Sequence, residues 1–213
     1  MKKVILSIAT IALLTSCGSE KKQELTTEEI SNPKISEVAK KSSTKSETYS
    51  VVNDSTSSLI WTGSAIGKTH YGSVDYKGDL KIESGKLTGG ELTFDMKTIN
   101  TQDLEGEWKQ KLDGHLMAPD FFNVDSFPSA KLSIKNYDGN QINGELTIKD
   151  VVKNITFPAT LNITKGKIEG NAEFSINRTD YGIVYGSGNF FELAKDKVIS
   201  DDINFKVSIK AVN

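Results

Sequence analysis

The stretch ITFPATLNITKGKIEGNAEFSI, residues 155–176, alternates apolar and polar side chains on both sides of a short polar turn. Ile155, Phe157 and Ala159 begin the first run, and Ala172, Phe174 and Ile176 end the second. Because successive side chains of a β-strand point to opposite faces, this period of two predicts two antiparallel strands that share one apolar face. The intervening Thr-Lys-Gly-Lys sequence is typical of a tight hairpin.

The same alternation recurs through most of the chain after residue 49. Further alternating runs lie at 59–65, 74–82, 86–99, 132–134, 142–148 and 203–209. Glycine-containing turns at 84–86 and 137–140 separate neighbouring runs, and another turn is predicted at Lys77–Gly78. Short connections favour up-and-down order, and closure of the sheet removes its exposed edges. We therefore predict an all-β fold, an antiparallel up-and-down barrel of about eight strands, which can hold side chains or one small ligand.

Residues 103–128 interrupt this pattern. Leu104, Trp108 and Leu112 recur every four residues, which predicts a short helix over 103–112 with one apolar face. The next segment, GHLMAPDFFNVDSFP at 114–128, carries three aromatic residues between acids and prolines. Pro119 and Pro128 cannot donate ladder hydrogen bonds, so this segment is predicted to be a loop. Because its aromatic surface must be buried, helix and loop together are expected to form a lid over the barrel mouth.

The 114–128 segment resembles the signature segment of the YceI-like family, the lipocalin-like polyisoprenoid-binding proteins of bacteria. Shorter pieces at 61–63, 70–72, 94–96, 144–149 and 178–183 fit the same pattern in the same order. The resemblance extends from about Tyr49 to Val212. It implies a lipocalin-like barrel that binds a polyisoprenoid chain or an isoprenoid quinone, for carriage or storage of that lipid in the cell envelope.

The N-terminus is typical of an exported bacterial protein. A basic start is followed by an apolar run at 4–14 that is too short to span a bilayer, and the chain's one cysteine, Cys17, comes three residues later. This arrangement resembles a lipobox, which predicts a lipoprotein signal peptide at 1–17 and a lipid anchor on Cys17. The absence of Asp after Cys17 favours the outer membrane, facing either the periplasm or the surface. The alternative is an ordinary secretory signal.

Residues 18–48 lack aromatics and are rich in Lys, Glu, Ser and Thr, which predicts a flexible tether before a barrel domain at 49–213.

Composition and motifs argue against most catalytic functions. The net charge is −2 and no basic stripe is visible, so no nucleic-acid partner is expected. The chain has two histidines, His70 and His115, whose spacing from Asp120 and other acids matches no metal pattern. No nucleophile elbow, phosphate-binding loop or zinc-protease motif is present. We expect no enzyme, cofactor or metal; an enzyme that uses His70, His115 and Asp120 is the remaining catalytic alternative.

The predicted ligand site combines tunnel wall, lid and polar mouth. The expected ligand-binding residues are Trp61, Leu92, Phe94, Met96, Phe157, Phe174 and Phe205 in the wall, Trp108, Phe121 and Phe122 in the lid, and His70, His115 and Arg178 at the mouth. The two tryptophans have an alternative role as core residues. Arg178 has an alternative structural role, because it could pair with Asp180 or Asp95 and hold the end of the barrel together.

Two questions stay open from the sequence. Small residues such as Gly63, Gly78, Gly144 and Gly170 either leave room inside the barrel or mark bends and bulges. The barrel correspondingly either contains a lipid or is filled by its own side chains, in which case the protein would be a structural or interaction lipoprotein. A homodimer is compatible with either alternative.

Overall fold

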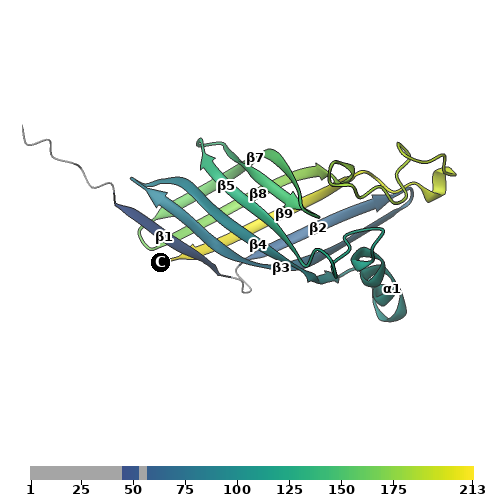
Figure 1. Ribbon diagram of the computed structural model, residues 1–213. Helices are drawn as coiled ribbons and strands as arrows, with labels where there is room; N and C mark the ends of the chain where they lie inside the picture. Colours follow the sequence, from purple (N-terminus) through teal and green to yellow (C-terminus); the bar gives the residue numbers. More distant parts are fainter. Residues whose placement is uncertain (1–44, 53–56) are drawn as a thin grey trace, which may run out of the picture. The chain divides into compact units, whose positions relative to one another are not determined.

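The computed structural model describes residues 45–52 and 57–213, and their strands form one closed antiparallel barrel (Figure 1). Each strand from β2 to β9 pairs with its neighbour in the sequence, and β9 pairs with β2 to close the ring. The strands are β1 (Ser46–Val52), β2 (Ser58–Ala65), β3 (Lys68–Glu83), β4 (Lys86–Thr101), β5 (Ser129–Tyr137), β6 (Gln141–Ile148), β7 (Val151–Thr164), β8 (Lys167–Asn177) and β9 (Asp202–Val212). The predicted all-β, up-and-down, lipocalin-like barrel is confirmed.

Nine strands occupy eight positions around the barrel because β1 and β2 share one of them. Both pair with β3 and with β9: Ser46 lies opposite Glu83, and Ile60 lies opposite Ser73 farther along the same strand. The predicted number of about eight therefore matches the ring β2–β9. β1 begins at Ser46, three residues before the expected start of the barrel domain at 49.

The alternating runs bury their apolar side chains as predicted. On β3, for example, Tyr76, Leu80 and Ile82 are buried, whereas the residues between them are exposed or partly exposed. The predicted turn at Lys77–Gly78 is wrong, because β3 continues through both residues and pairs them with Thr93 and Leu92. A Cβ on Gly78 would lie 2.0 Å from the Glu91 carbonyl oxygen, so glycine is needed here for the close approach of two strands.

The helix forms later in the chain than predicted. α1 spans Gly106–Met117, because the Asp103 side chain accepts hydrogen bonds from the backbone N–H of Tyr71 and from His70 and thus holds the chain against β3. The first four residues of the predicted 114–128 loop are consequently helical. α1 ends at Met117 because Pro119 disfavours helical geometry at Ala118, whose backbone is extended.

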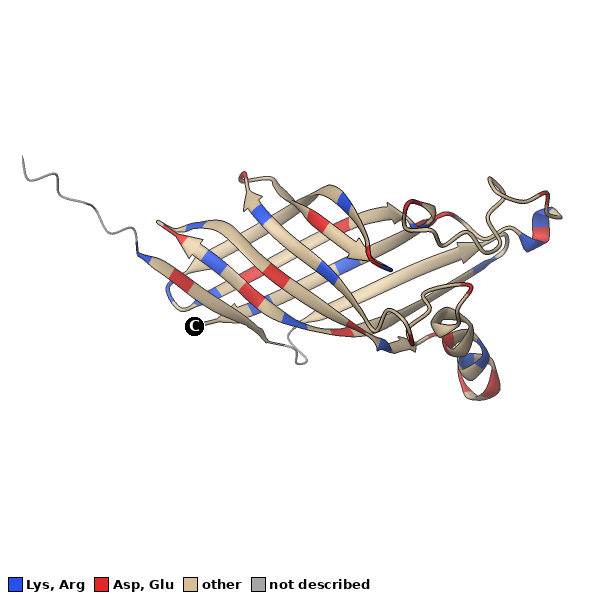
Figure 2. Cartoon of the chain, viewed as in Figure 1, with Lys and Arg blue, Asp and Glu red and all other residues tan. Residues whose placement is uncertain are grey.

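Two short 3₁₀ helices complete the described chain: η1 (Arg178–Tyr181) and η2 (Lys195–Lys197), both between β8 and β9. The outer surface of the strands carries charges of both signs without a block of either (Figure 2). The expected signal peptide, Cys17 and all of the expected tether before residue 45 lie outside the described residues. In the part of the chain that the structure describes, no helix is long and apolar enough to cross a membrane.

Candidate functional site

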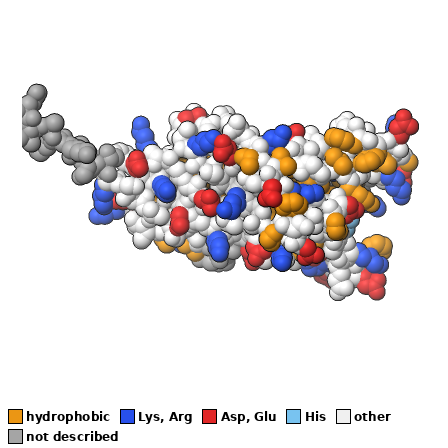
Figure 3. Space-filling view, in the orientation of Figure 1, with side chains coloured by type: hydrophobic (Ala, Val, Ile, Leu, Met, Phe, Trp, Pro, Cys, Tyr) orange, Lys and Arg blue, Asp and Glu red, His pale blue; other side chains and the backbone are white. Residues whose placement is uncertain are grey.

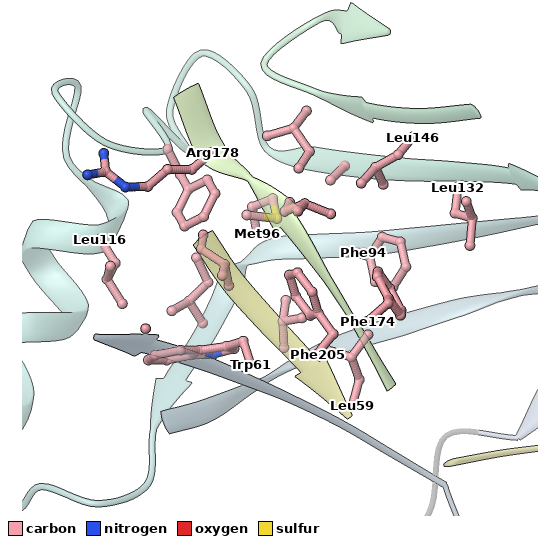
Figure 4. A pocket seen from close by; sticks show the side chains of 18 of the residues that line it. Leu59, Trp61, Phe94, Met96, Leu116, Leu132, Leu146, Phe174, Arg178 and Phe205 are labelled. Carbon is pink, nitrogen blue, oxygen red and sulfur yellow. The ribbon is translucent and has the colours of Figure 1, made fainter. Parts of the chain in front are cut away.

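The barrel encloses an apolar cavity at the end that carries α1. Its volume is about 130 Å³, and inward-facing side chains of β2 to β9 form its wall (Figure 4). Gly63 contributes to this wall, and no atom lies within 4 Å of the position that a Cβ would occupy there. At this position, therefore, a small residue leaves room inside the barrel. Gly144, by contrast, packs against β5, where its Cβ would lie 2.5 Å from the Ser133 carbonyl oxygen.

A second apolar cavity of about 80 Å³ continues the first one deeper into the barrel. The two share Leu59, Phe94, Leu132, Phe157 and Phe174 in their walls. Phe174 is central to this boundary, since its ring stacks on Phe157 at 4.2 Å and on Phe205 at 5.3 Å between ring centroids. Stacked aromatic rings thus lie between the two cavities inside one barrel.

The 130 Å³ cavity is called the upper cavity below, and the 80 Å³ cavity the lower cavity. Residues 116–128 close one side of the upper cavity. Leu116, Phe121 and Phe122 all line it. The segment is held by backbone hydrogen bonds from Phe122 N–H to the Leu116 carbonyl at 3.1 Å and from Val124 N–H to the Met117 carbonyl at 3.1 Å. These bonds satisfy carbonyls at the helix C-terminus that would otherwise lack partners. The Lys149 ammonium also donates to the Phe121 carbonyl at 2.9 Å. The phenylalanine pair is therefore firmly positioned over the cavity.

α1 is fixed to the barrel through Asp113. Its carboxylate accepts a hydrogen bond from the Thr101 backbone N–H at 2.8 Å and another from the Lys109 ammonium at 2.6 Å. Burial alone would raise the pKa of Asp113, but the hydrogen bonds with Lys109 and Thr101 outweigh it and hold that pKa below its ordinary value. The ionised carboxylate is thus part of the folded structure.

Arg178 is 1% exposed, and its guanidinium is occupied by the protein itself. It donates to the backbone carbonyls of Ser200 at 2.9 Å, Ile183 at 2.7 Å and Ile199 at 3.2 Å, and to the Asp201 carboxylate at 3.3 Å. Burial lowers the pKa of Arg178, and the charge of Asp201 opposes that shift. The side chain lines the cavity beside the Phe121 ring, 5.6 Å from its centroid, while its charged end binds both ends of the 183–201 segment. The partner is therefore Asp201, neither Asp180 nor Asp95.

Nine of the thirteen predicted ligand-binding residues line the upper cavity. They are Trp61, Phe94, Met96, Phe121, Phe122, Phe157, Phe174, Arg178 and Phe205. Leu92 lines the lower cavity instead. Trp108 lines neither cavity and is 71% exposed, contrary to its expected place in the lid, because α1 projects from the end of the barrel (Figure 1). Leu112 and Leu116 form the packed face of the helix.

Neither histidine lines either of these two cavities. His70 Nδ1 lies 2.8 Å from Asp103 Oδ2, in a link between β3 and the residues before α1. The ring of His115 packs against Tyr185 and Phe121, with centroids 4.5 and 5.6 Å away, and its Nε2 is buried without a hydrogen-bond partner. Among residues 45–52 and 57–213, no three His, Cys, Asp or Glu side chains gather as a metal site would require.

Several cavity residues were not predicted. Leu59, Val74, Leu132, Leu146, Ile155 and Ile176 occupy inward positions of alternating runs, so their periodicity could have identified them. Ile199 and Ser200 are different, because they lie in an irregular segment that distant parts of the chain hold at the cavity. Arg178 binds both of their carbonyls, and the Ser200 N–H donates to the Ser64 carbonyl at 2.8 Å. No local pattern in the sequence indicates that contact.

Comparison with known proteins assigns a family to this barrel. Residues 49–211 match the model of the YceI-like domain. A UPF0312 protein of Pseudomonas putida is 30% identical over 120 residues, which are 51% of this chain and 60% of that protein. A UPF0312 protein of Staphylococcus aureus is 29% identical over 106 residues, 45% of this chain and 62% of that one. The matched region thus spans less than two thirds of these curated relatives.

Solved structures share the fold. A polyisoprenoid-binding domain from Saccharophagus degradans, implicated in plant cell wall breakdown, has a TM-score of 0.59 at 15% identity, over 77% of this chain and 97% of that one. BcnA of Burkholderia cenocepacia has a TM-score of 0.59 at 19% identity, over 73% and 96%. The YceI protein of Campylobacter jejuni has a TM-score of 0.54 at 25% identity, over 67% and 84%.

Proposed function

Because the chain belongs to the YceI-like family, we propose that its barrel binds one long apolar lipid, a polyisoprenoid or an isoprenoid quinone, in the cavity beneath Phe121 and Phe122. The observation that supports this proposal most directly is the cavity itself, which has a volume of about 130 Å³ and an apolar wall inside a closed barrel. The fold similarity to a polyisoprenoid-binding domain supports the choice of lipid class.

Burial of an isoprenoid tail supplies enough free energy for useful affinity. Removing about 500 Å² of apolar surface from water contributes on the order of 12 kcal/mol. Immobilising the partners and ordering a flexible tail consume a large part of this gain. The lower cavity extends the available length once Phe174 moves, so that one site accommodates tails of different lengths. Arg178 orders the wall and leaves recognition to shape and apolar contact.

The proposed setting is the bacterial cell envelope. An acyl anchor on Cys17 would hold the barrel at the outer membrane, where apolar lipids need a carrier or a store because they are insoluble in water. The sequence from Met1 to Cys17 supports this proposal by its resemblance to a lipoprotein signal. Labelling of growing cells with a radioactive fatty acid tests the anchor, and Cys17→Ala should abolish the labelling.

The alternative is a barrel without a guest. It is favoured by the stack of Phe157, Phe174 and Phe205, which already fills the middle of the barrel. The two candidates differ in what the purified protein contains. Full-length protein produced in bacteria is extracted with organic solvent, and the extract is analysed by mass spectrometry. A prenyl lipid at about one mole per mole supports the carrier, whereas its absence from protein with an intact fold supports the filled barrel.

A further inference from the structure

Exposed apolar side chains gather at one end of the barrel. Nine large hydrophobic residues are exposed among those the structure describes, and seven of them come from three segments at the α1 end. We call these seven the end patch: Ile66, Tyr71, Trp108, Tyr185, Phe190, Phe191 and Leu193. Figure 3 shows hydrophobic side chains over the end of the barrel that carries α1 and the segment between β8 and β9. The other two, Val152 and Val212, lie on β7 and β9.

Contacts join the three segments that carry the end patch to one another. Ile199 forms a β-bridge with Ala65, next to Ile66. The Tyr185 ring lies 4.5 Å from that of His115 on α1. Asp103, shortly before α1, accepts the backbone N–H of Tyr71 at 3.0 Å. The apolar residues therefore project from a connected framework, and their exposure follows from the fold.

The segment between β8 and β9 shows this most clearly. Its base is fixed, since Ser187 is fully buried and the side-chain amide of Asn189 donates to Asp201 at 2.7 Å. Immediately after Asn189 in the chain, Phe190 is 57% exposed and Phe191 is 49% exposed. Burial of these two phenylalanine rings would contribute favourable free energy, and that contribution is absent while the rings stay in water. Exposed aromatic clusters of this kind mark surfaces that become buried against a partner.

The composition and charge of the end patch indicate which kind of partner it contacts. Trp, Tyr and Phe are the side chains that sit at the level of lipid headgroups, with Lys beside them. The patch has this arrangement, because Lys195 and Lys197 follow Leu193, Lys68 follows Ile66, and the Lys111 ammonium lies 5.0 Å above the Trp108 ring. Lys68 and Lys195 can complement lipid phosphates, whereas Lys111 and Lys197 already pair with Glu107 at 3.3 Å and with Asp196 at 3.5 Å. Glu192 and Asp196 lie in the same segment, so apolar insertion is expected to contribute more than attraction to anionic lipid.

The end patch lies next to the upper cavity. Ile199, at the base of the same segment, lines the upper cavity. We infer that the end patch docks the barrel onto the surface of a lipid bilayer, with Trp108, Phe190 and Phe191 inserted at headgroup level. Docking there places the end of the cavity against the membrane. This inference does not require that the cavity bind an isoprenoid, and its test involves no cavity ligand.

Trp108 reports on docking directly. The full-length protein is mixed with phosphatidylcholine vesicles whose acyl chains are brominated, with and without phosphatidylglycerol, and tryptophan emission is recorded. We expect blue-shifted and strongly quenched emission from Trp108. In Trp108→Phe the remaining emission comes from Trp61 inside the barrel and should be unaffected by bromine. Because the readout is local, an anchor at the N-terminus would not produce it.

Variants distinguish binding through the end patch from binding through exposed apolar side chains elsewhere on the protein. The double variant Phe190→Ser/Phe191→Ser should reduce quenching of Trp108 at least five-fold while the melting temperature stays unchanged. Leu193→Ser and Val212→Ser form a matched pair, since both residues are 38% exposed, and only the first should weaken quenching. The inference is overturned if bromine leaves Trp108 unquenched, or if the double variant is quenched like the wild type. It is also overturned if Trp108 becomes buried without lipid while sedimentation shows a dimer, because a second copy would then cover the patch.

Discussion

Arg178 Nη2 and Asp201 Oδ1 lie 3.3 Å apart, and this pair joins the residue that follows β8 to the residue that precedes β9, beside the cavity. The same guanidinium also binds the carbonyls of Ile183, Ile199 and Ser200. One side chain therefore fixes both ends of the segment that carries Phe190 and Phe191. Its apolar stem forms part of the cavity wall at the same time.

Replacement of Arg178 should therefore lower stability. Arg178→Met leaves three carbonyls and Asp201 without their partner, and breaking a buried pair of this kind costs about 3–5 kcal/mol. Arg178→Lys should rescue little, because an ammonium cannot match the planar fork. Differential scanning calorimetry measures both, with the exposed Lys135→Met as the control. A variant that keeps wild-type stability but loses bound lipid would show instead that Arg178 acts on the ligand.

Narrowing the cavity should remove the guest without unfolding the barrel. At Gly63 a side chain has space inside, so Gly63→Phe is expected to fill the upper cavity and to reduce co-purified lipid at least ten-fold. The neighbouring Thr62 points to the other face of β2, which makes Thr62→Phe the matched control. Mass spectrometry of solvent extracts gives the lipid content of each. Equal lipid in both variants would place the ligand elsewhere.

Removal of the Phe174 ring should join the two cavities. Phe174→Ala is expected to destabilise the protein by less than the about 3–5 kcal/mol that a fully buried phenylalanine contributes, because Phe174 is only partly buried. It should also shift the bound lipids towards longer chains, because the ring no longer separates the two spaces. Chemical denaturation and lipid mass spectrometry measure the two effects. An unchanged distribution of chain lengths would mean that the lower cavity is not used.

Stability should depend on the ionisation of Asp113. Its pKa is lowered from the ordinary value of 3.8, so the contribution is fully present above that pH and is lost as the pH falls through the lower folded-state pKa. Asp113→Asn should cost about 1.5–3 kcal/mol at pH 7, since hydrogen bonds to a charged group are broken. Its melting temperature should also fall less than that of the wild type between pH 5 and pH 3. Parallel curves for the two proteins would contradict this role.

Sequence periodicity identified the parts of the site that strands build. Phe94, Phe157 and Phe174 follow from alternation, because a closed barrel leaves only one place for an apolar face. Pro119 could also have fixed the end of α1, since it constrains the residue before it. The start of α1 and the exposure of Trp108 depend on the bonds of Asp103 to β3, which no local pattern reveals. Likewise the pairing of Arg178 with Asp201 depends on how the chain returns between β8 and β9.

We propose that the space beside Trp61 takes one isoprenoid. Titration of the Trp108→Phe variant with an isoprenoid quinone tests this most directly, because Trp61 then remains as the one tryptophan and lines the cavity. We predict saturable quenching at one quinone per protein, reversed by a polyprenol that carries no quinone ring. Trp61 emission that stays constant throughout the titration, in protein first freed of lipid and refolded, would contradict the claim.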